Sequence, residues 1–242
     1  MNKIAIGCLT LVLQAACASP PKIHISEFSV DNPSGLRETR AEGNQDFAEL
    51  VTALRGKQFG DLIFKENSTA YLITPTVDAY DLELTAKEEA FSIDEYQARL
   101  TRLRTLHEHF LIFSLDLRLP FYAGWSQSEQ LDFLKRNLVI TLENGSGYTY
   151  TPQRQIFNVI ERFHDKPTDF ESAKRLAVRV PVRVYFKKTQ ASGATILAHA
   201  KEFVIKLRLK KSPPYHLGFW EDKYYQGFRW LISGNGSQAS VS

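Results

Sequence analysis

Cysteine is nearly absent from this chain. Its 242 residues include two cysteines, Cys8 and Cys17, and none follows Cys17. The body after Cys17 therefore cannot contain the disulfide framework that is common in small exported domains. The chain also lacks an apolar run of about 18 residues, the length that a membrane-spanning helix requires. We therefore expect no membrane-spanning segment in the body.

A large excess of charge is missing as well. The 30 basic and 27 acidic residues give a formal net charge of +3, which is too small to favour a polyanionic partner through the overall field. We therefore expect no nucleic-acid partner. The body also has no G-x-S-x-G, P-loop or H-E-x-x-H motif and no cysteine nucleophile. From these absences the sequence predicts a non-enzymatic protein without a cofactor or a metal site.

The first 17 residues have the three-part layout of a secretory signal. Lys3 precedes an apolar run from Ile4 to Leu13, and small residues follow. The stretch LQAAC, which ends at Cys17, resembles the lipobox of bacterial lipoprotein signal peptides, although Gln14 follows the expected leucine. This resemblance implies that Cys17 becomes the lipidated N-terminus and carries palmitate.

The same resemblance implies an address in the cell. Ala18 follows the cysteine, which in lipoproteins of Gram-negative bacteria favours the outer membrane, with the body facing the periplasm. Two alternatives stay open. Ala16, Cys17 and Ala18 also form an A-x-A cleavage site, which would release a soluble periplasmic or secreted protein. Without export, the segment would be a buried strand or helix with inert thiols.

The body is long enough, and apolar enough at 43% hydrophobic residues, to bury a core. Its 16 Phe and 10 Tyr favour β structure. Apolar residues alternate with polar ones in four stretches, which predict strands that are apolar on one face: 110–120, 138–152, 177–186 and 202–211. Such strands need a second layer. The sequence therefore predicts a β-rich α+β fold with an antiparallel β-sandwich, immunoglobulin-like or similar.

Two helices are predicted to pack on these sheets. Apolar residues at helical spacing predict one near residues 45–55 and another over 93–108, where Ser92 and Glu95 form a capping box. Residues 69–84 read as strand, with Pro75 at an edge or bulge. The expected organisation is a signal peptide (1–17), a tether (18–22), an α+β part (23–109), a β-sandwich part (110–232) and a flexible tail (233–242).

Basic residues on the outward faces of two late strands form the first candidate site. If these strands pair, a basic stripe results that would suit an anionic glycan, an anionic lipid surface or an acidic envelope protein. Cross-strand partners such as Asp116 and Glu202 would instead make it an ordinary solvated face. The six residues are Arg179, Arg183, Lys187, Lys206, Arg208 and Lys210.

An aromatic segment, Phe219 to Trp230, forms the second candidate. Trp220, Tyr224, Tyr225 and Trp230 would make a surface for a sugar or a partner protein. The alternative, which we favour, is that this strand fills the core. His107 and His109 come closest to a metal pair, but His107 at a helix end also complements the helix dipole.

Together these features predict a membrane-anchored envelope lipoprotein that acts as a binding or assembly module. A hydrolase of peptidoglycan or polysaccharide is the alternative. It would use carboxylates such as Asp165, Asp169 and Glu171, and it would require two of them about 5 to 10 Å apart. The sequence indicates neither the ligand nor the oligomeric state.

Overall fold

Two β-sheets form the centre of the protein. The computed structural model describes residues 19–28, 51–60, 68–120, 126–158, 161–164, 176–211 and 225–233. Sheet A has the order β1-β11-β10-β5-β6, with β2 also paired to β11. Its strands are β1 (Lys22–His24), β2 (Lys57–Gly60), β5 (Leu138–Glu143), β6 (Thr149–Tyr150), β10 (Glu202–Leu209) and β11 (Gln226–Ser233).

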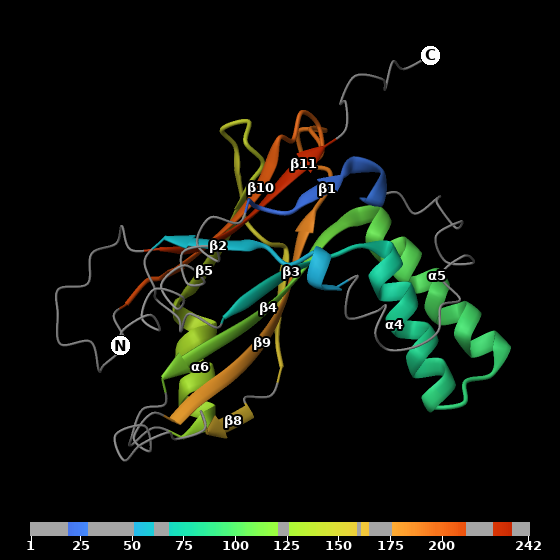
Figure 1. Ribbon diagram of the computed structural model, residues 1–242, viewed down its shortest axis with the longest axis horizontal. Coiled ribbons are helices and arrows are strands. Elements are labelled where there is room, and N and C mark those ends of the chain that lie inside the picture. Colours follow the sequence, from blue (N-terminus) through green and yellow to red (C-terminus); the bar gives the residue numbers. More distant parts are fainter. Residues whose placement is uncertain are drawn as a thin grey trace, which may run out of the picture.

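Sheet B has the order β3-β4-β9-β7, with β8 also paired to β9. Its strands are β3 (Thr69–Ile73), β4 (Phe110–Pro120), β7 (Arg154–Phe157), β8 (Glu161–His164) and β9 (Leu176–Lys187). Within the described residues, every strand pair is antiparallel except β1 and β11, which run parallel. In Figure 1 the sheet B strands β3, β4 and β9 run side by side toward the lower left of the view.

The core lies between the apolar faces of the two sheets. The period-two pattern is confirmed, because the inward residues of β4, β5, β9 and β10 are buried. The ring of Phe113 on β4 contacts residues of sheet A, with its centroid 6.3 Å from that of Phe203 and 5.2 Å from that of Trp230. A β-rich α+β fold with two sheets is thus confirmed. Its finer likeness to an immunoglobulin domain stays a prediction.

The helices differ from the prediction. The described elements include α4 (Pro75–Glu88), α5 (Ile93–His109), α6 (Gln127–Asn137) and the short 3-10 helix η1 (Ile25–Phe28). Of the helix predicted near residues 45–55, only the part from residue 51 onward is described, and residues 51–53 are helical. The described residues therefore contain more helices than the two that were predicted.

The predicted strand over residues 69–84 was wrong beyond Ile73. Thr74 caps α4 by accepting a hydrogen bond from the Val77 backbone N–H, and Pro75 occupies the first turn, where its missing N–H costs nothing. Helix α6 was missed, although Ser126 and Glu129 form a complete capping box there. In both cases a local signal favours the start of a helix: Thr74 with Pro75 for α4, and Ser126 with Glu129 for α6.

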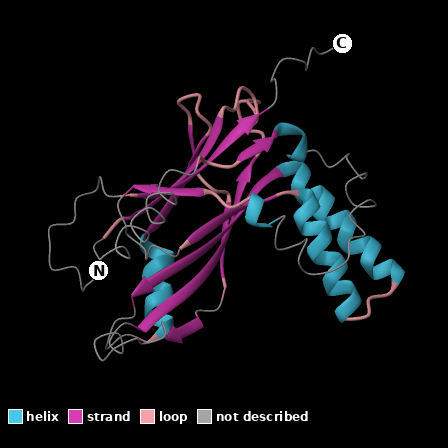
Figure 2. Cartoon of the chain, in the orientation of Figure 1, coloured by secondary structure: helices cyan, strands magenta, loops and turns pink. Residues whose placement is uncertain are grey.

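Helix α5 agrees with the prediction to within one residue. The Ser92 side chain accepts a hydrogen bond from the Glu95 backbone N–H, as expected. The Glu95 carboxylate pairs instead with Arg99 at 2.8 Å, one turn further along. In Figures 1 and 2, α4 and α5 lie side by side at one end of the sheets, while α6 lies at the other.

The segment before residue 110 contributes strands to both sheets. Strand β3 pairs with β4 in sheet B, whereas β1 and β2 pair with β11 in sheet A. The region predicted as a tether already makes contact, since the Pro21 carbonyl accepts a hydrogen bond from the Leu231 N–H at 2.8 Å. Among the described residues, no helix combines the length and the apolar character needed to cross a membrane.

One short segment passes from sheet B to sheet A. The Leu54 carbonyl accepts a hydrogen bond from Leu72 on β3, and the Gly56 N–H donates one to Ala70 on the same strand. The next residue, Lys57, begins β2 and pairs with β11. The segment from Leu54 to Gly56 therefore connects the edges of the two sheets.

Substitution of Gly56 by alanine tests this connection. A Cβ atom at Gly56 would lie 2.5 Å from Cζ2 of Trp230, a buried ring that cannot move aside. We expect Gly56→Ala to lower the free energy of unfolding by about 2 kcal/mol, the usual cost of overpacking a core. Urea denaturation of the two proteins measures the difference.

The double variant Gly56→Ala with Trp230→Phe separates the clash from other effects. Phenylalanine removes the outer indole atoms that the new methyl group would meet, so the double variant should lose less stability than the sum of the two single losses. Strict additivity would show that the methyl group and the indole do not meet.

Candidate functional site

The six predicted basic residues do not form one stripe. Strand β9 belongs to sheet B and β10 to sheet A, and the two strands do not pair. Since the apolar faces of the two sheets face each other, the outward faces of β9 and β10 point away from each other. The prediction failed because alternation shows which face of a strand is polar but not which strand lies beside it.

Three of the six cations have carboxylate partners. Arg179 Nε lies 2.8 Å from Asp116 Oδ1, and Lys206 Nζ lies 2.7 Å from Glu143 Oε1. Arg183 pairs with Asp78. The other three, Lys187, Arg208 and Lys210, are exposed and form no ion pair with another described residue. An ordinary solvated face therefore describes Arg179 and Lys206, whereas Arg183 bonds to a buried carboxylate.

The aromatic candidates have different environments. Trp230 is fully buried in the core, and its Nε1 donates a hydrogen bond to the Leu54 carbonyl at 2.8 Å. Tyr225 is half-buried and lies edge-on to Phe59. For Trp230 the core-filling interpretation is confirmed and the binding surface is wrong. Trp220 and Tyr224 lie outside the described residues.

Of the remaining candidates, four lie outside the described residues and two lie at the end of a helix. Asp165, Asp169, Glu171 and Cys17 lie outside the described residues. Both His107 and His109 are in the last turn of α5, not on a strand, and only His107 is buried. Among the described residues, no group of three or more His, Cys, Asp or Glu is placed to hold a metal ion.

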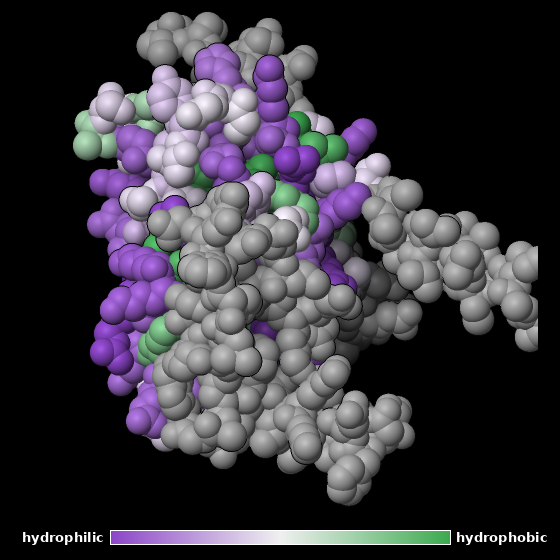
Figure 3. Space-filling model, turned by 90° about the vertical axis from the view of Figure 1, so that its left-hand side faces the viewer, coloured by the Kyte–Doolittle hydropathy of each residue, from purple (hydrophilic) through white to green (hydrophobic). Residues whose placement is uncertain are grey.

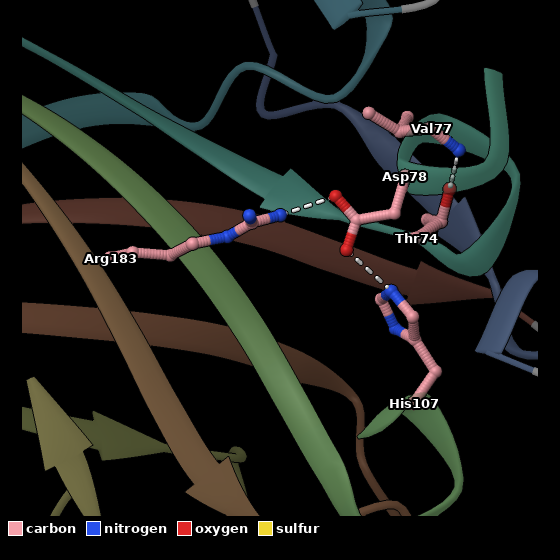
Figure 4. A network of polar contacts seen from close by, with 5 residues as sticks. All are labelled: Thr74, Val77, Asp78, His107 and Arg183. Carbon is pink, nitrogen blue, oxygen red and sulfur yellow. Dashed lines mark hydrogen bonds and ion pairs between the residues drawn. The ribbon is translucent and has the colours of Figure 1, made fainter. Parts of the chain in front are cut away.

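A buried polar network joins the helices to sheet B. Asp78, on the first turn of α4, accepts hydrogen bonds from Nε2 of His107 at 2.8 Å and from the guanidinium of Arg183 on β9 (Figure 4). Asp78 and His107 are 5% and 2% exposed. One carboxylate therefore connects α4, α5 and β9 at the base of the helical pair.

Two opposed effects set the pKa of Asp78. Burial raises it, but the hydrogen bond from His107 and the positive charge of Arg183 together lower it more, so the net pKa lies below the ordinary value. The carboxylate is therefore ionised and its oxygens are occupied by partners on the protein itself. This arrangement fits a structural network that positions α4 and α5.

An open groove on the other side of the protein was not predicted. It has a volume of about 680 Å³ and is lined by residues at the end of α6, at the end of β10 and along β7. Four of its side chains are cationic, namely Lys135, Arg136, Arg154 and Lys210. None of the described residues that line it is a carboxylate. Of the six predicted basic residues, the groove includes Lys210 alone.

The fold explains how these cations meet. Leu138 at the start of β5 pairs with Leu209 on β10, and the Lys210 N–H donates a hydrogen bond to the Asn137 carbonyl at 2.9 Å. This contact places Lys210 beside the last turn of α6. There Lys135 and Arg136 complement the negative end of the helix dipole. That structural reason does not apply to Arg154 or Lys210, which come from other elements.

The groove follows an edge of sheet B. All residues from Pro152 to Phe157 line it, whereas the face of a strand would contribute only alternate residues. Strand β7 pairs with β9 on one side, and no described strand pairs with the other. Hydrophilic side chains dominate the described surface in the view of Figure 3, so polar surface alone does not identify a site. The distinguishing feature is a groove at a sheet edge that four cations and, among the described residues, no carboxylate line.

Substitution of Asp78 by asparagine tests the buried network. The neutral amide would leave the Arg183 guanidinium without its counter-charge and would replace the carboxylate that bonds to His107, so we expect the free energy of unfolding at pH 7 to fall by about 3 kcal/mol. Because the folded-state pKa of Asp78 is lowered, its contribution is complete above the unfolded pKa of about 3.9 and disappears as the pH falls through the folded value.

The difference between the two proteins should therefore shrink in acid, which urea denaturation at pH 7 and pH 3 measures. Glu88→Gln is the matched control, since Glu88 is an exposed carboxylate at the end of the same helix. We expect that control to stay within about 0.5 kcal/mol of the native protein. An equal loss in both variants would contradict the structural role of Asp78.

Comparison with protein-family models, with curated proteins and with solved structures finds no match to this chain. We therefore infer the candidate site from the residues of this chain alone.

Proposed function

We propose that the protein is a membrane-anchored lipoprotein of the bacterial envelope, and that it acts as a non-enzymatic binding or assembly module. The anchor is Cys17, at the end of the LQAAC stretch. Two or more acyl chains on one residue hold a protein on a membrane stably, whereas a single chain does so only marginally. The proposed address is the outer membrane, on its periplasmic side.

The observation that carries this proposal is how soon the body begins after Cys17. The Pro21 carbonyl bonds to Leu231 and β1 begins at Lys22, so the first contacts with sheet A come four to five residues after the cysteine. Four residues span at most about 14 Å. A lipid on Cys17 would therefore keep Pro21, the residue before β1 at one end of sheet A, within about 14 Å of the membrane surface.

The composition of the groove supports binding as its role. Cations and amides such as Gln153 and Gln155 line it, and these groups hold ligands through charge and hydrogen bonds. General acid–base chemistry near neutral pH mostly uses His or carboxylates, which occur elsewhere in the described chain. We also infer that the two facing sheets form one sandwich-like core, which makes the groove a fixed surface.

Metabolic labelling with palmitate tests the anchor. The native chain should incorporate the label and fractionate with membranes, and Cys17→Ala should lose both properties. Cys8→Ala is the matched control, because Cys8 is the other thiol and stands inside the apolar run; it should behave like the native chain. Equal labelling and membrane association of Cys17→Ala would overturn the proposal.

A further inference from the structure

We infer that the groove is a docking site for an extended acidic peptide segment of a partner protein, which adds as a strand to the free edge of β7. This inference rests on the proposed function, since it names the partner chemistry of the binding module. It concerns the groove between β7, α6 and the end of β10, and it requires no contribution from the lipid anchor.

The first argument is the open edge of sheet B, which has no further strand among the described residues. An edge strand presents unpaired backbone N–H and C=O groups, which can bond to a further strand. Residues Pro152 to Phe157 all line the groove, so the groove runs along this edge. Its length suits a segment of about six extended residues, roughly 20 Å.

The second argument is charge. Lys135, Arg136, Arg154 and Lys210 surround the edge, and the described lining includes no carboxylate to neutralise them. Several cations elsewhere on the described sheets have a carboxylate partner, as in Arg179 with Asp116 and Lys206 with Glu143, whereas the described lining of the groove brings four cations together without one. The groove therefore holds an uncompensated positive potential that favours glutamate and aspartate on the incoming strand.

The third argument is the apolar part of the lining. Ile156 and Phe157 are half-buried and pack against the core, so they offer a fixed apolar surface beside the cations. A strand that alternates acidic and apolar residues matches both features, because its side chains point alternately to opposite faces. An anionic polysaccharide would match the charge but would not use the backbone edge.

Binding of a defined peptide tests this inference. The probe is fluorescent acetyl-(Glu-Val)3-amide, titrated with the full chain purified in non-ionic detergent, and the read-out is fluorescence anisotropy. We expect saturable binding that weakens as salt is raised, since the contacts are partly ionic. N-methylation of alternate peptide nitrogens keeps the charge but removes main-chain hydrogen bonds, and should weaken binding about tenfold or more.

Charge reversals identify the site. Lys135→Glu together with Lys210→Glu should weaken binding at least about tenfold, whereas Lys201→Glu should change it less than about twofold. Lys201 is the matched control, because it is an exposed lysine that precedes β10 while Lys210 follows it, some 30 Å away along the strand, by a rise of roughly 3.4 Å per residue. Thermal unfolding checks that each variant folds.

Three outcomes would overturn the inference: no binding of the peptide, equal binding of the N-methylated peptide, or equal losses in Lys201→Glu and the double variant. Oligogalacturonate, a carboxylated glycan, is titrated in parallel, and preferential binding of it would assign the groove to a glycan and not to a peptide. Palmitate labelling is measured separately. A chain that binds the peptide but carries no lipid would overturn the anchor and leave the docking site standing.

Discussion

The contact between Trp230 and the segment from Leu54 to Gly56 holds the two sheets together at one corner. The indole lies on sheet A, touches Phe113 of sheet B, and donates a hydrogen bond to the Leu54 carbonyl, which also accepts one from Leu72 on β3. Without the indole N–H, the Leu54 carbonyl would accept only the hydrogen bond from Leu72, and its second lone pair would have no donor. The close approach requires glycine at residue 56, because any side chain there would occupy the space of the ring.

The Asp78 network solves a different problem on the outer face of sheet B. The apolar contacts between α4 and α5 come mainly from a small cluster around Ala79, Leu82 and Leu100, separate from the main core. Such a pair of helices needs a fixed attachment to the sheet. A carboxylate that bonds to His107 and Arg183 provides one, and it is directional, whereas apolar packing alone is not. Burial makes this attachment sensitive to the loss of any single partner.

The sequence correctly predicted which face of each strand is buried, but it did not predict which strands lie side by side. Alternation along β4, β9 and β10 correctly placed their apolar residues in the core, because the period of a strand is local. It could not show that β9 and β10 belong to different sheets, since pairing depends on residues far apart in the chain. For the same reason the groove was missed: Lys135 and Lys210 meet where the end of α6 contacts the end of β10, and Arg154 lines the same groove from β7 of the other sheet. Helix α6 had a readable signal in Ser126 and Glu129, and α4 had one in Thr74 and Pro75, which also suits a strand edge.

The cations that line the groove beside β7 explain how an open edge can persist on this fold. A free edge invites addition of a second copy of the same sheet, and positive side chains beside it repel an identical basic edge. The repulsion acts against another β7, which carries the same Arg154 and the same neighbouring lysines, but it becomes attraction for an acidic strand. Self-association and partner selection are therefore governed by one set of charges. An uncharged edge could not distinguish a second copy of the chain from an acidic partner strand. If the cations at the edge were paired with carboxylates of the same chain, as Arg179 is with Asp116, their charge would attract neither of them.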